Sequence, residues 1–254
     1  MEFEIDRREV LRYLQTSKDL KDENINRLID ESIKEIKDII NFRYLYQKYP
    51  IEINDQGIDI LNTTLTLKGK SIKKHLNNSN EIYLLAATLG AQVDKKISYY
   101  EKISVTKSMI FDACATTAIE AGCDKVESEI KKEVLKEGYA DITFRYSPGY
   151  GDLSIDIQKE FLRVLNAPKK IGLTASKYNM LIPTKSVTAI IGVIAEKEEK
   201  IEQNVDEDSA EEKCKESEQS EEQDLDFETK NCQNCRLFKD CELRRKGIYC
   251  GAEG

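Results

Sequence analysis

The stretch EIYLLAATL, residues 81–89, is a nearly continuous apolar run that ends at Gly90. A run of this length that is bounded by a turn residue is typical of a strand buried on both faces. We therefore expect a buried strand here that feeds directly into a turn. Beyond the turn, the spacing of apolar residues favours a charged amphipathic helix over residues 92–101 and the longest helix of the chain over residues 104–136.

The same two periodicities, 3.6 for helices and 2 for strands, predict the remaining elements. Ahead of residue 81 they predict helices over residues 7–14 and 22–40, strands over 42–53 and 58–67, and a short helix over 69–76. Beyond residue 136 they predict a strand over 141–146, a turn over 147–151, a helix over 155–165, and a hairpin of 180–183 with 187–194. Asp22 and Ser154 stand where helix N-caps are expected.

Charge is distributed unevenly along the chain, which has 254 residues and a formal net charge of −8. Residues 196–229 contain 16 Asp or Glu and 4 Lys, a local charge of −12 that leaves +4 for the rest. This acidic segment has almost no apolar residues to offset its chain entropy, so we expect a disordered linker. The mildly basic remainder suits an anionic ligand or an acidic partner, and it lacks the dense basic patch of a nucleic-acid-binding protein.

These features predict three segments: an α+β domain over residues 1–195, the acidic linker over 196–229, and a cysteine-rich tail over 230–254. We expect no membrane span because no run of about 18 apolar residues is present. Residues 1–6 lack the basic flank and apolar core of a signal peptide. We therefore expect a cytoplasmic protein whose thiols stay reduced.

The tail contains four of the seven cysteines, in the spacing C-x2-C-x5-C-x8-C. A C-x2-C pair directs two thiolates at one ion, and two further thiolates complete a tetrahedral set. We expect a metal site and favour an iron–sulfur cluster over zinc, because the uneven gaps do not match the paired spacing of a zinc ribbon. Four unliganded thiols are the alternative. The predicted metal ligands are Cys232, Cys235, Cys241 and Cys250.

The other cysteines and the single histidine carry less information. Cys114 and Cys123 lie within the long predicted helix, where we expect them to be buried apolar residues. Cys214 lies in the acidic linker and is given no role. His75 is the chain's only histidine, so catalysis by a histidine base has one candidate.

Arg145-Tyr146-Ser147-Pro148-Gly149-Tyr150 is the most informative stretch of the body. An arginine at the end of a strand offers a rigid fork for a carboxylate. Gly149 lets the backbone approach a ligand closely, and the two tyrosines can cover an apolar or aromatic surface. Taken alone, a Pro-Gly stretch of this kind is more often an ordinary turn.

With its surroundings, this turn resembles a known family. Residues from about 80 to 195 are similar to the S-adenosylmethionine-binding activation, or reactivation, domain of cobalamin-dependent methionine synthase. The similar motifs are Ala87-Thr88-Leu89-Gly90, Asp112-Ala113-Cys114-Ala115 with Ile119-Glu120-Ala121, Arg145-x-x-x-Gly149-Tyr150, and Gly172-Leu173-Thr174 followed by residues 176–193. The resemblance implies a stand-alone, C-shaped single α+β domain with a central antiparallel sheet and flanking helices.

The resemblance also implies a ligand site. The family's R-x-x-x-G-Y motif contacts S-adenosylmethionine, which implies a cofactor-binding role for four residues here, Arg145, Ser147, Gly149 and Tyr150. Acidic residues of the long helix reach the ligand in the family, and Asp124 and Glu120 are the candidates in this chain. Three features depart from the family pattern. Gly151-Asp152 replaces the usual proline after Gly-Tyr, and Tyr139 stands where the family usually has an acidic residue about six positions before the arginine, although Asp141 is near. Residues 183–191 lack the aromatic side chain that helps to hold the ligand.

The implied function is to bind S-adenosylmethionine and support the reductive methylation of cobalamin on a partner corrinoid methyltransferase. A methionine synthase without its own activation domain is the first choice of partner, and the chain would be its accessory component, with or without enzymatic turnover. A cluster in the tail would add electron delivery; otherwise a separate electron donor is needed. Two alternatives stay open: a non-catalytic adaptor that binds S-adenosylmethionine or a corrinoid protein, and a structural protein with a zinc tail.

Overall fold

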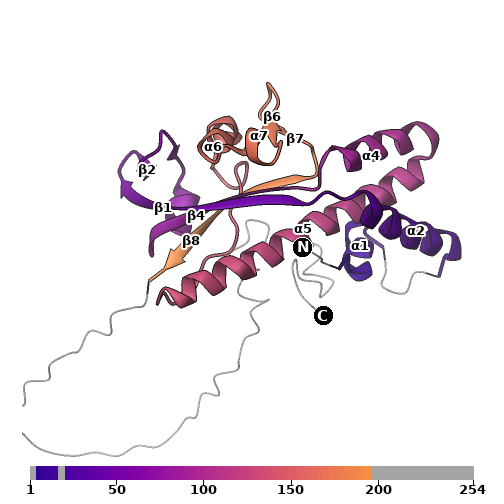
Figure 1. The fold of residues 1–254 in the computed structure, drawn as a ribbon, viewed down its shortest axis with the longest axis horizontal. Coiled ribbons are helices and arrows are strands. Elements are labelled where there is room, and N and C mark those ends of the chain that lie inside the picture. Colours follow the sequence, from indigo (N-terminus) through magenta and orange to yellow (C-terminus); the bar gives the residue numbers. More distant parts are fainter. Residues whose placement is uncertain (1–3, 17–20, 196–254) are drawn as a thin grey trace, which may run out of the picture. The chain divides into compact units, whose positions relative to one another are not determined.

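The computed structural model describes residues 4–16 and 21–195, so the predicted linker and all four predicted metal ligands lie outside the described residues. The described chain combines a six-stranded antiparallel sheet, in the order β3-β2-β1-β4-β8-β5, with a two-stranded sheet of β6 and β7 (Figure 1). Helices cover both faces of the large sheet. The expected α+β class, with a central antiparallel sheet and flanking helices, is therefore confirmed.

The bounds of most elements agree with the periodicity to within a few residues. The strands are β1 (Arg43–Asn54), β2 (Gly57–Ile60), β3 (Thr66–Leu67), β4 (Ser79–Thr88), β5 (Asp141–Ile142), β6 (Thr174–Ala175), β7 (Leu181–Ile182) and β8 (Ser186–Ile194). The helices are α1 (Arg7–Tyr13), α2 (Glu23–Ile39), α3 (Lys70–His75), α4 (Ala91–Ile103), α5 (Val105–Lys136), the 3-10 turn η1 (Ile155–Ile157), α6 (Gln158–Val164) and α7 (Ala167–Lys170).

The apolar stretch of residues 81–89 forms most of β4, which lies in the middle of the sheet between β1 and β8. Because successive side chains of a strand point to opposite faces, Ile82, Leu84 and Ala86 join one hydrophobic core. Tyr83 and Leu85 join another core on the opposite face. Burial on both faces explains why this strand is apolar without alternation.

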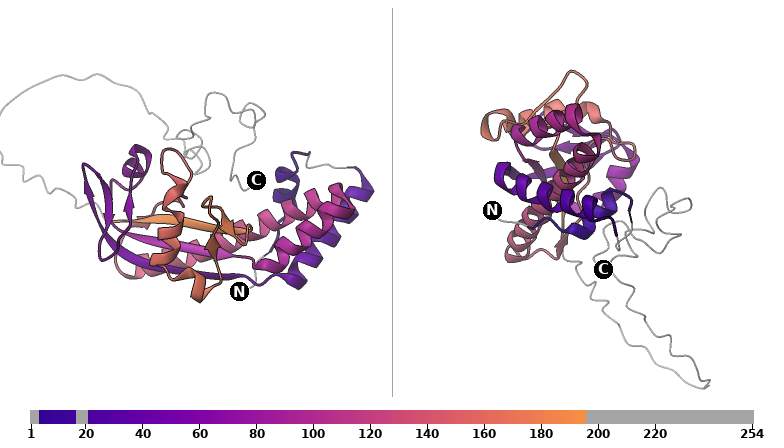
Figure 2. Two further views of the ribbon diagram at one scale, coloured as in Figure 1. Left: turned by 90° about the horizontal axis from the view of Figure 1, so that it is seen from above. Right: turned by 90° about the vertical axis from the view of Figure 1, so that its right-hand side faces the viewer.

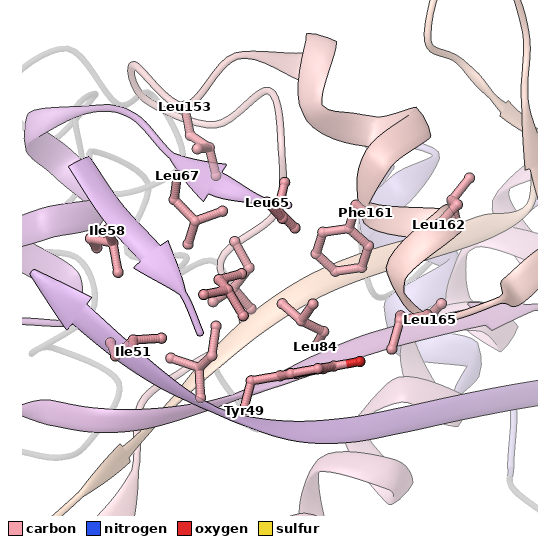
Figure 3. Packing of buried hydrophobic residues seen from close by; sticks show 14 of the residues in the cluster. Tyr49, Ile51, Ile58, Leu65, Leu67, Leu84, Leu153, Phe161, Leu162 and Leu165 are labelled. Atoms are coloured by element: carbon pink, nitrogen blue, oxygen red, sulfur yellow. The ribbon is translucent and has the colours of Figure 1, made fainter. Parts of the chain in front are cut away.

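One face of the sheet is covered by α6 and α7, whose apolar residues pack onto β4 and β1. Phe161 and Leu165 lie over Leu84 and Tyr49 in this core, and β2 and β3 contribute Ile58 and Leu67 to the same cluster (Figure 3). The other face is crossed by α5, a helix of 32 residues. The first part of α5 packs instead against α1, α2 and α4, away from the sheet (Figure 2).

Side-chain caps begin the long helices where the sequence indicates them. The Asp22 carboxylate accepts hydrogen bonds from the N–H groups of residues 24 and 25, at 2.9 and 3.1 Å. The Ser154 hydroxyl accepts one from Asp156 N–H at 3.1 Å and so starts η1 and α6. Such contacts satisfy N–H groups that have no partner within the helix.

Three local predictions were wrong. Residues 58–67 are not one strand, because Asn62 adopts a left-handed conformation (φ = 63°) and the chain turns between β2 and β3. The strand over residues 141–146 shrinks to β5 and a single bridge between Tyr146 and Ile190. The proposed hairpin is absent, since β7 pairs with β6 rather than with β8. Neither β6 nor α7 was predicted, because each is too short to show a period.

Among the residues that the structure describes, no helix combines the length and apolarity needed to cross a membrane.

Candidate functional site

The Arg145 turn begins where pairing between β8 and the chain after β5 ends. Tyr146 and Ile190 exchange both main-chain hydrogen bonds, at 2.9 and 2.8 Å. In the same register Pro148 would stand opposite Thr188, but proline has no N–H to donate to a ladder. The strand therefore stops at this proline, and the chain turns away from the sheet edge.

Main-chain hydrogen bonds then close the turn. Gly149 has φ = 97°, a conformation that side chains disfavour, and its N–H donates to the Leu153 carbonyl at 2.9 Å. The Tyr150 N–H donates to the Ser147 carbonyl at 3.1 Å. Ser147 and Gly149 thus shape the turn through their backbone. The Tyr150 side chain is 68% exposed and projects from it.

Arg145 itself is held by three carboxylates on α5. Its Nη2 lies 3.1 Å from Glu120 Oε2 and 2.7 Å from Asp124 Oδ1, and its Nη1 lies 2.8 Å from Glu127 Oε2. The spacing i, i+4, i+7 places the three acids on one face of the helix. The structure thus brings together Arg145, Asp124 and Glu120, which the sequence singled out, with Glu127, which it missed.

Burial and charge act in opposite directions in this cluster. Burial disfavours the charged guanidinium, but Glu127 and Asp124 outweigh that cost and raise the pKa of Arg145 above its usual value. Burial raises the pKa of Glu127, and Arg145 only partly offsets this. Three carboxylates face one guanidinium here, so negative charge exceeds positive charge when all are ionised. Such a site can receive a cationic group and, through Arg145, a carboxylate.

A second group of residues fixes the turn to α3. The Asp152 carboxylate accepts hydrogen bonds from the N–H groups of Lys70 and Ser71, at 2.6 and 3.0 Å. It thus caps α3, whose N-cap residue, Gly69, has no side chain to do so. Gly151-Asp152 replaces the family's proline, and Asp152 here holds the turn against α3. Its partners are distant in sequence, so the sequence pattern held no signal for it.

His75 holds the strand that leads into the turn. Its Nε2 lies 3.0 Å from the Phe144 carbonyl, and its ring packs against the rings of Phe144 and Tyr146, with centroids 4.4 and 5.0 Å away. Burial lowers the pKa of His75. No carboxylate is recorded against this ring among the described residues, so the geometry indicates a positioning residue rather than a catalytic base.

The late segment that lacks the family's aromatic side chain is fixed by polar contacts instead. Asp94 of α4 accepts hydrogen bonds from Thr184 and Lys185 N–H groups, at 2.6 and 3.3 Å. The Lys185 ammonium pairs with Asp112 of α5 at 2.9 Å and donates to Thr116 Oγ1 at 2.8 Å. These contacts also explain why residues 183–185 do not form the loop of a β7–β8 hairpin.

The cysteine predictions have separate outcomes. Cys114 and Cys123 are buried within a hydrophobic cluster, as expected, and burial raises the pKa of both thiols to about 12. The four tail cysteines lie outside the described residues. Within the described ranges no group of three His, Cys, Asp or Glu residues is arranged to hold a metal ion.

Comparisons with known proteins bear on the fold. No protein family model and no curated protein matches the chain. Its structure is similar to a crystal structure of the MetH reactivation domain bound to AdoHcy, with a TM-score of 0.55, 14% sequence identity, and coverage of 73% of each chain. The resemblance noted in the sequence is thus matched in three dimensions: the described domain has the fold of the MetH reactivation domain.

Proposed function

We propose that this domain binds S-adenosylmethionine at the Arg145 turn and supports the reductive methylation of cobalamin on a partner corrinoid methyltransferase. A methionine synthase that lacks its own activation domain is the partner we favour. The observation that carries the proposal is the meeting of Arg145 with three carboxylates of α5, on a fold similar to a reactivation domain that binds AdoHcy.

The charges of the ligand match those of the cluster. S-adenosylmethionine has a carboxylate, an ammonium group and a sulfonium ion. Arg145 would turn its fork from Asp124, whose side chain is 68% exposed, to the ligand carboxylate. Asp124 and Glu120 would then face the ammonium and sulfonium charges, while Glu127, only 29% exposed, would stay on Arg145.

The chemistry needs no acid or base from the protein. One electron reduces cobalt(II) to cobalt(I), whose electron pair attacks the sulfonium methyl group; the C–S bond breaks and the neutral thioether leaves. The methyl group is electrophilic before it binds, so the contribution of the domain is positioning, which can supply a large part of a barrier. A single histidine that acts only in packing is compatible with this mechanism.

Calorimetric titration with S-adenosylmethionine tests the binding site. We expect stoichiometric binding by the full-length protein and a loss of at least about tenfold in affinity for Arg145→Ala. Arg163→Ala is the matched control, because Arg163 is exposed and its recorded partners among the described residues are Glu160 and Thr64, not the carboxylates of α5. Absence of binding by the wild-type protein, with no change on Arg145→Ala, would favour the structural protein with a zinc tail.

Methyl transfer tests the reaction. With a corrinoid partner, a reductant and S-adenosylmethionine, we expect methylcobalamin to form at a rate that depends on the protein and falls in Arg145→Ala. Tight binding of S-adenosylmethionine without any methylation of the corrinoid would leave a sensor or docking module as the function.

For the tail, we propose that Cys232, Cys235, Cys241 and Cys250 bind an iron–sulfur cluster that delivers the electron. The linker would hold this donor at high effective concentration near the corrinoid. Reconstitution with iron and sulfide should give visible absorption, which Cys235→Ser should diminish. Stoichiometric zinc and no visible absorption would reject the cluster and leave a structural tail.

A further inference from the structure

A buried polar pair stands on the opposite face of the sheet from Arg145. Gln158, the first residue of α6, is 4% exposed, and its Nε2 donates to Thr188 Oγ1 of β8 at 2.7 Å. Gln158 Oε1 has no hydrogen-bond partner among the described residues. Buried polar atoms in folded proteins are almost always paired, so an unpaired amide oxygen next to a ligand-binding turn calls for a partner.

The main-chain N–H and C=O groups of Thr188 also have no recorded hydrogen-bond partner among the described residues on the side of β8 that faces β5. On β8, Ile190 and Gly192 use their N–H and C=O groups toward the β5 side of the strand, and Thr188 has the same parity. Pairing on that side ends at Tyr146, because Pro148 would be next. No hydrogen bond to the Thr188 N–H or carbonyl is recorded within the described ranges, although the residue is 3% exposed.

The pair therefore offers a compact set of donors and acceptors. The Thr188 N–H and hydroxyl are donors, and the Thr188 carbonyl and Gln158 Oε1 are acceptors. The set lies two residues along β8 from the Tyr146–Ile190 bridge, where the Arg145 turn begins. An aminopurine has the complementary edge, with an exocyclic amino group that donates two hydrogen bonds beside a ring nitrogen that accepts one.

We propose that Gln158, oriented by Thr188, is the residue that selects a 6-aminopurine in the ligand by accepting a hydrogen bond from its amino group. This inference rests on the proposed function, and it names the part of the nucleoside that the Gln158–Thr188 pair recognises. A 6-oxopurine would place an oxygen acceptor against the Gln158 oxygen. The pair would then be left unsatisfied, which is how buried polar groups reject a ligand without the matching group.

The test compares two ligands that differ only at this edge, S-adenosylhomocysteine and S-inosylhomocysteine, by calorimetry with the full-length protein. We expect the wild-type protein to bind the adenosyl compound at least about tenfold more tightly. Gln158→Met should lower affinity for the adenosyl compound by about tenfold and leave the inosyl affinity nearly unchanged. Lys159→Met, an exposed change on the same helix, should preserve the wild-type ratio.

Thr188 provides a second variant that keeps the test decisive. Thr188→Val removes the hydroxyl that orients the Gln158 amide and should also reduce the adenosyl preference, whereas Thr188→Ser should retain it. Thermal melting of each variant shows whether it is folded, and if Gln158→Met does not fold, the Thr188 pair of variants decides.

The possible failures are distinguishable. Equal losses for both ligands in Gln158→Met, or an unchanged ratio in the folded variants, would overturn the selection role and mean that a water molecule satisfies Gln158; the proposed function would stand. A wild-type protein that binds neither compound would overturn the proposed function, and this inference with it.

Discussion

The two sides of α5 differ in how many carboxylates contact each partner side chain. Toward β1, each acid has its own partner, in a series that advances four residues along the helix and two along the strand. The pairs are Tyr44 with Glu129 at 3.1 Å, Tyr46 with Glu133 at 2.6 Å, and Lys48 with Glu137. Four helical residues rise about 6.0 Å and two strand residues about 6.6 Å, so the two elements stay in register.

Toward Arg145, by contrast, three acids share one guanidinium. On the β1 side each of the three acids has a different partner on the strand, and Lys48 also pairs with Glu81 of β4 at 2.9 Å. The Arg145 side has three carboxylates on one guanidinium and lies beside a turn that ends a sheet edge. Along this one helix, carboxylates that share a cation mark the surface that we propose for binding, and carboxylates with separate partners mark a packing surface.

Removal of Arg145 should give the largest effect on stability. In Arg145→Met, Glu127 would lose its cation while remaining mostly covered, and we expect unfolding in urea to show a loss of about 2 kcal/mol. The loss should be smaller than for a fully buried pair because 29% of the Glu127 side chain is exposed. Adding Glu127→Gln to the same chain should restore about half of the loss. Additive losses in the double variant would mean that the two side chains are energetically independent.

Replacing one carboxylate with an amide on each side of α5 should show which side contributes to ligand binding. Asp124→Asn removes a surplus carboxylate whose side chain is 68% exposed, so we expect little change in the urea midpoint but a loss of about tenfold in affinity for S-adenosylmethionine. Glu133→Gln on the β1 side should leave that affinity unchanged. Calorimetry on the two proteins checks the contrast, and equal affinities would remove the distinction between the two sides.

A hydroxyl deletion tests the β1 side directly. Tyr46→Phe keeps the ring packed between Tyr44 and Tyr83 but loses the hydrogen bond to Glu133, and we expect a loss of about 0.5–1 kcal/mol in urea unfolding. Binding of S-adenosylmethionine should be unaffected. A change in ligand affinity would show that the two sides of α5 are coupled.

The elements that carry the two sides of α5 could be predicted from local patterns in the sequence. The apolar run of residues 81–89 predicted β4, and helical periodicity predicted α5; the family resemblance added Glu120 and Asp124 as candidate ligand contacts, and the structure places both on one face of that helix. Glu127 lies on that same face, at i+7 from Glu120, so the same spacing was sufficient to include it.

Other parts depended on contacts between residues distant in sequence. The cap that Asp152 places on α3 spans about 80 residues, and the hydrogen bond between Gln158 and Thr188 spans 30. The segment between β7 and β8 is held by Asp94 of α4, whose contact with Thr184 spans 90 residues. Hydrophobic periodicity describes which face of an element is buried, but it does not specify which polar groups meet across elements.

The smallest expected effect concerns pH and the support of the Arg145 turn. Because burial lowers the pKa of His75 in the folded protein, the unfolded chain takes up a proton more readily at pH below about 6.5. Stability should therefore fall as pH drops below that value, and the fall should level off once pH passes below the folded-state pKa. His75→Gln retains a donor for the Phe144 carbonyl without titrating, so its urea midpoint should depend less on pH between 7.5 and 5. Identical pH profiles for the two proteins would mean that His75 takes up a proton as readily in the folded as in the unfolded chain. The contact of His75 with the Phe144 carbonyl would then support the Arg145 turn whether or not the ring is charged.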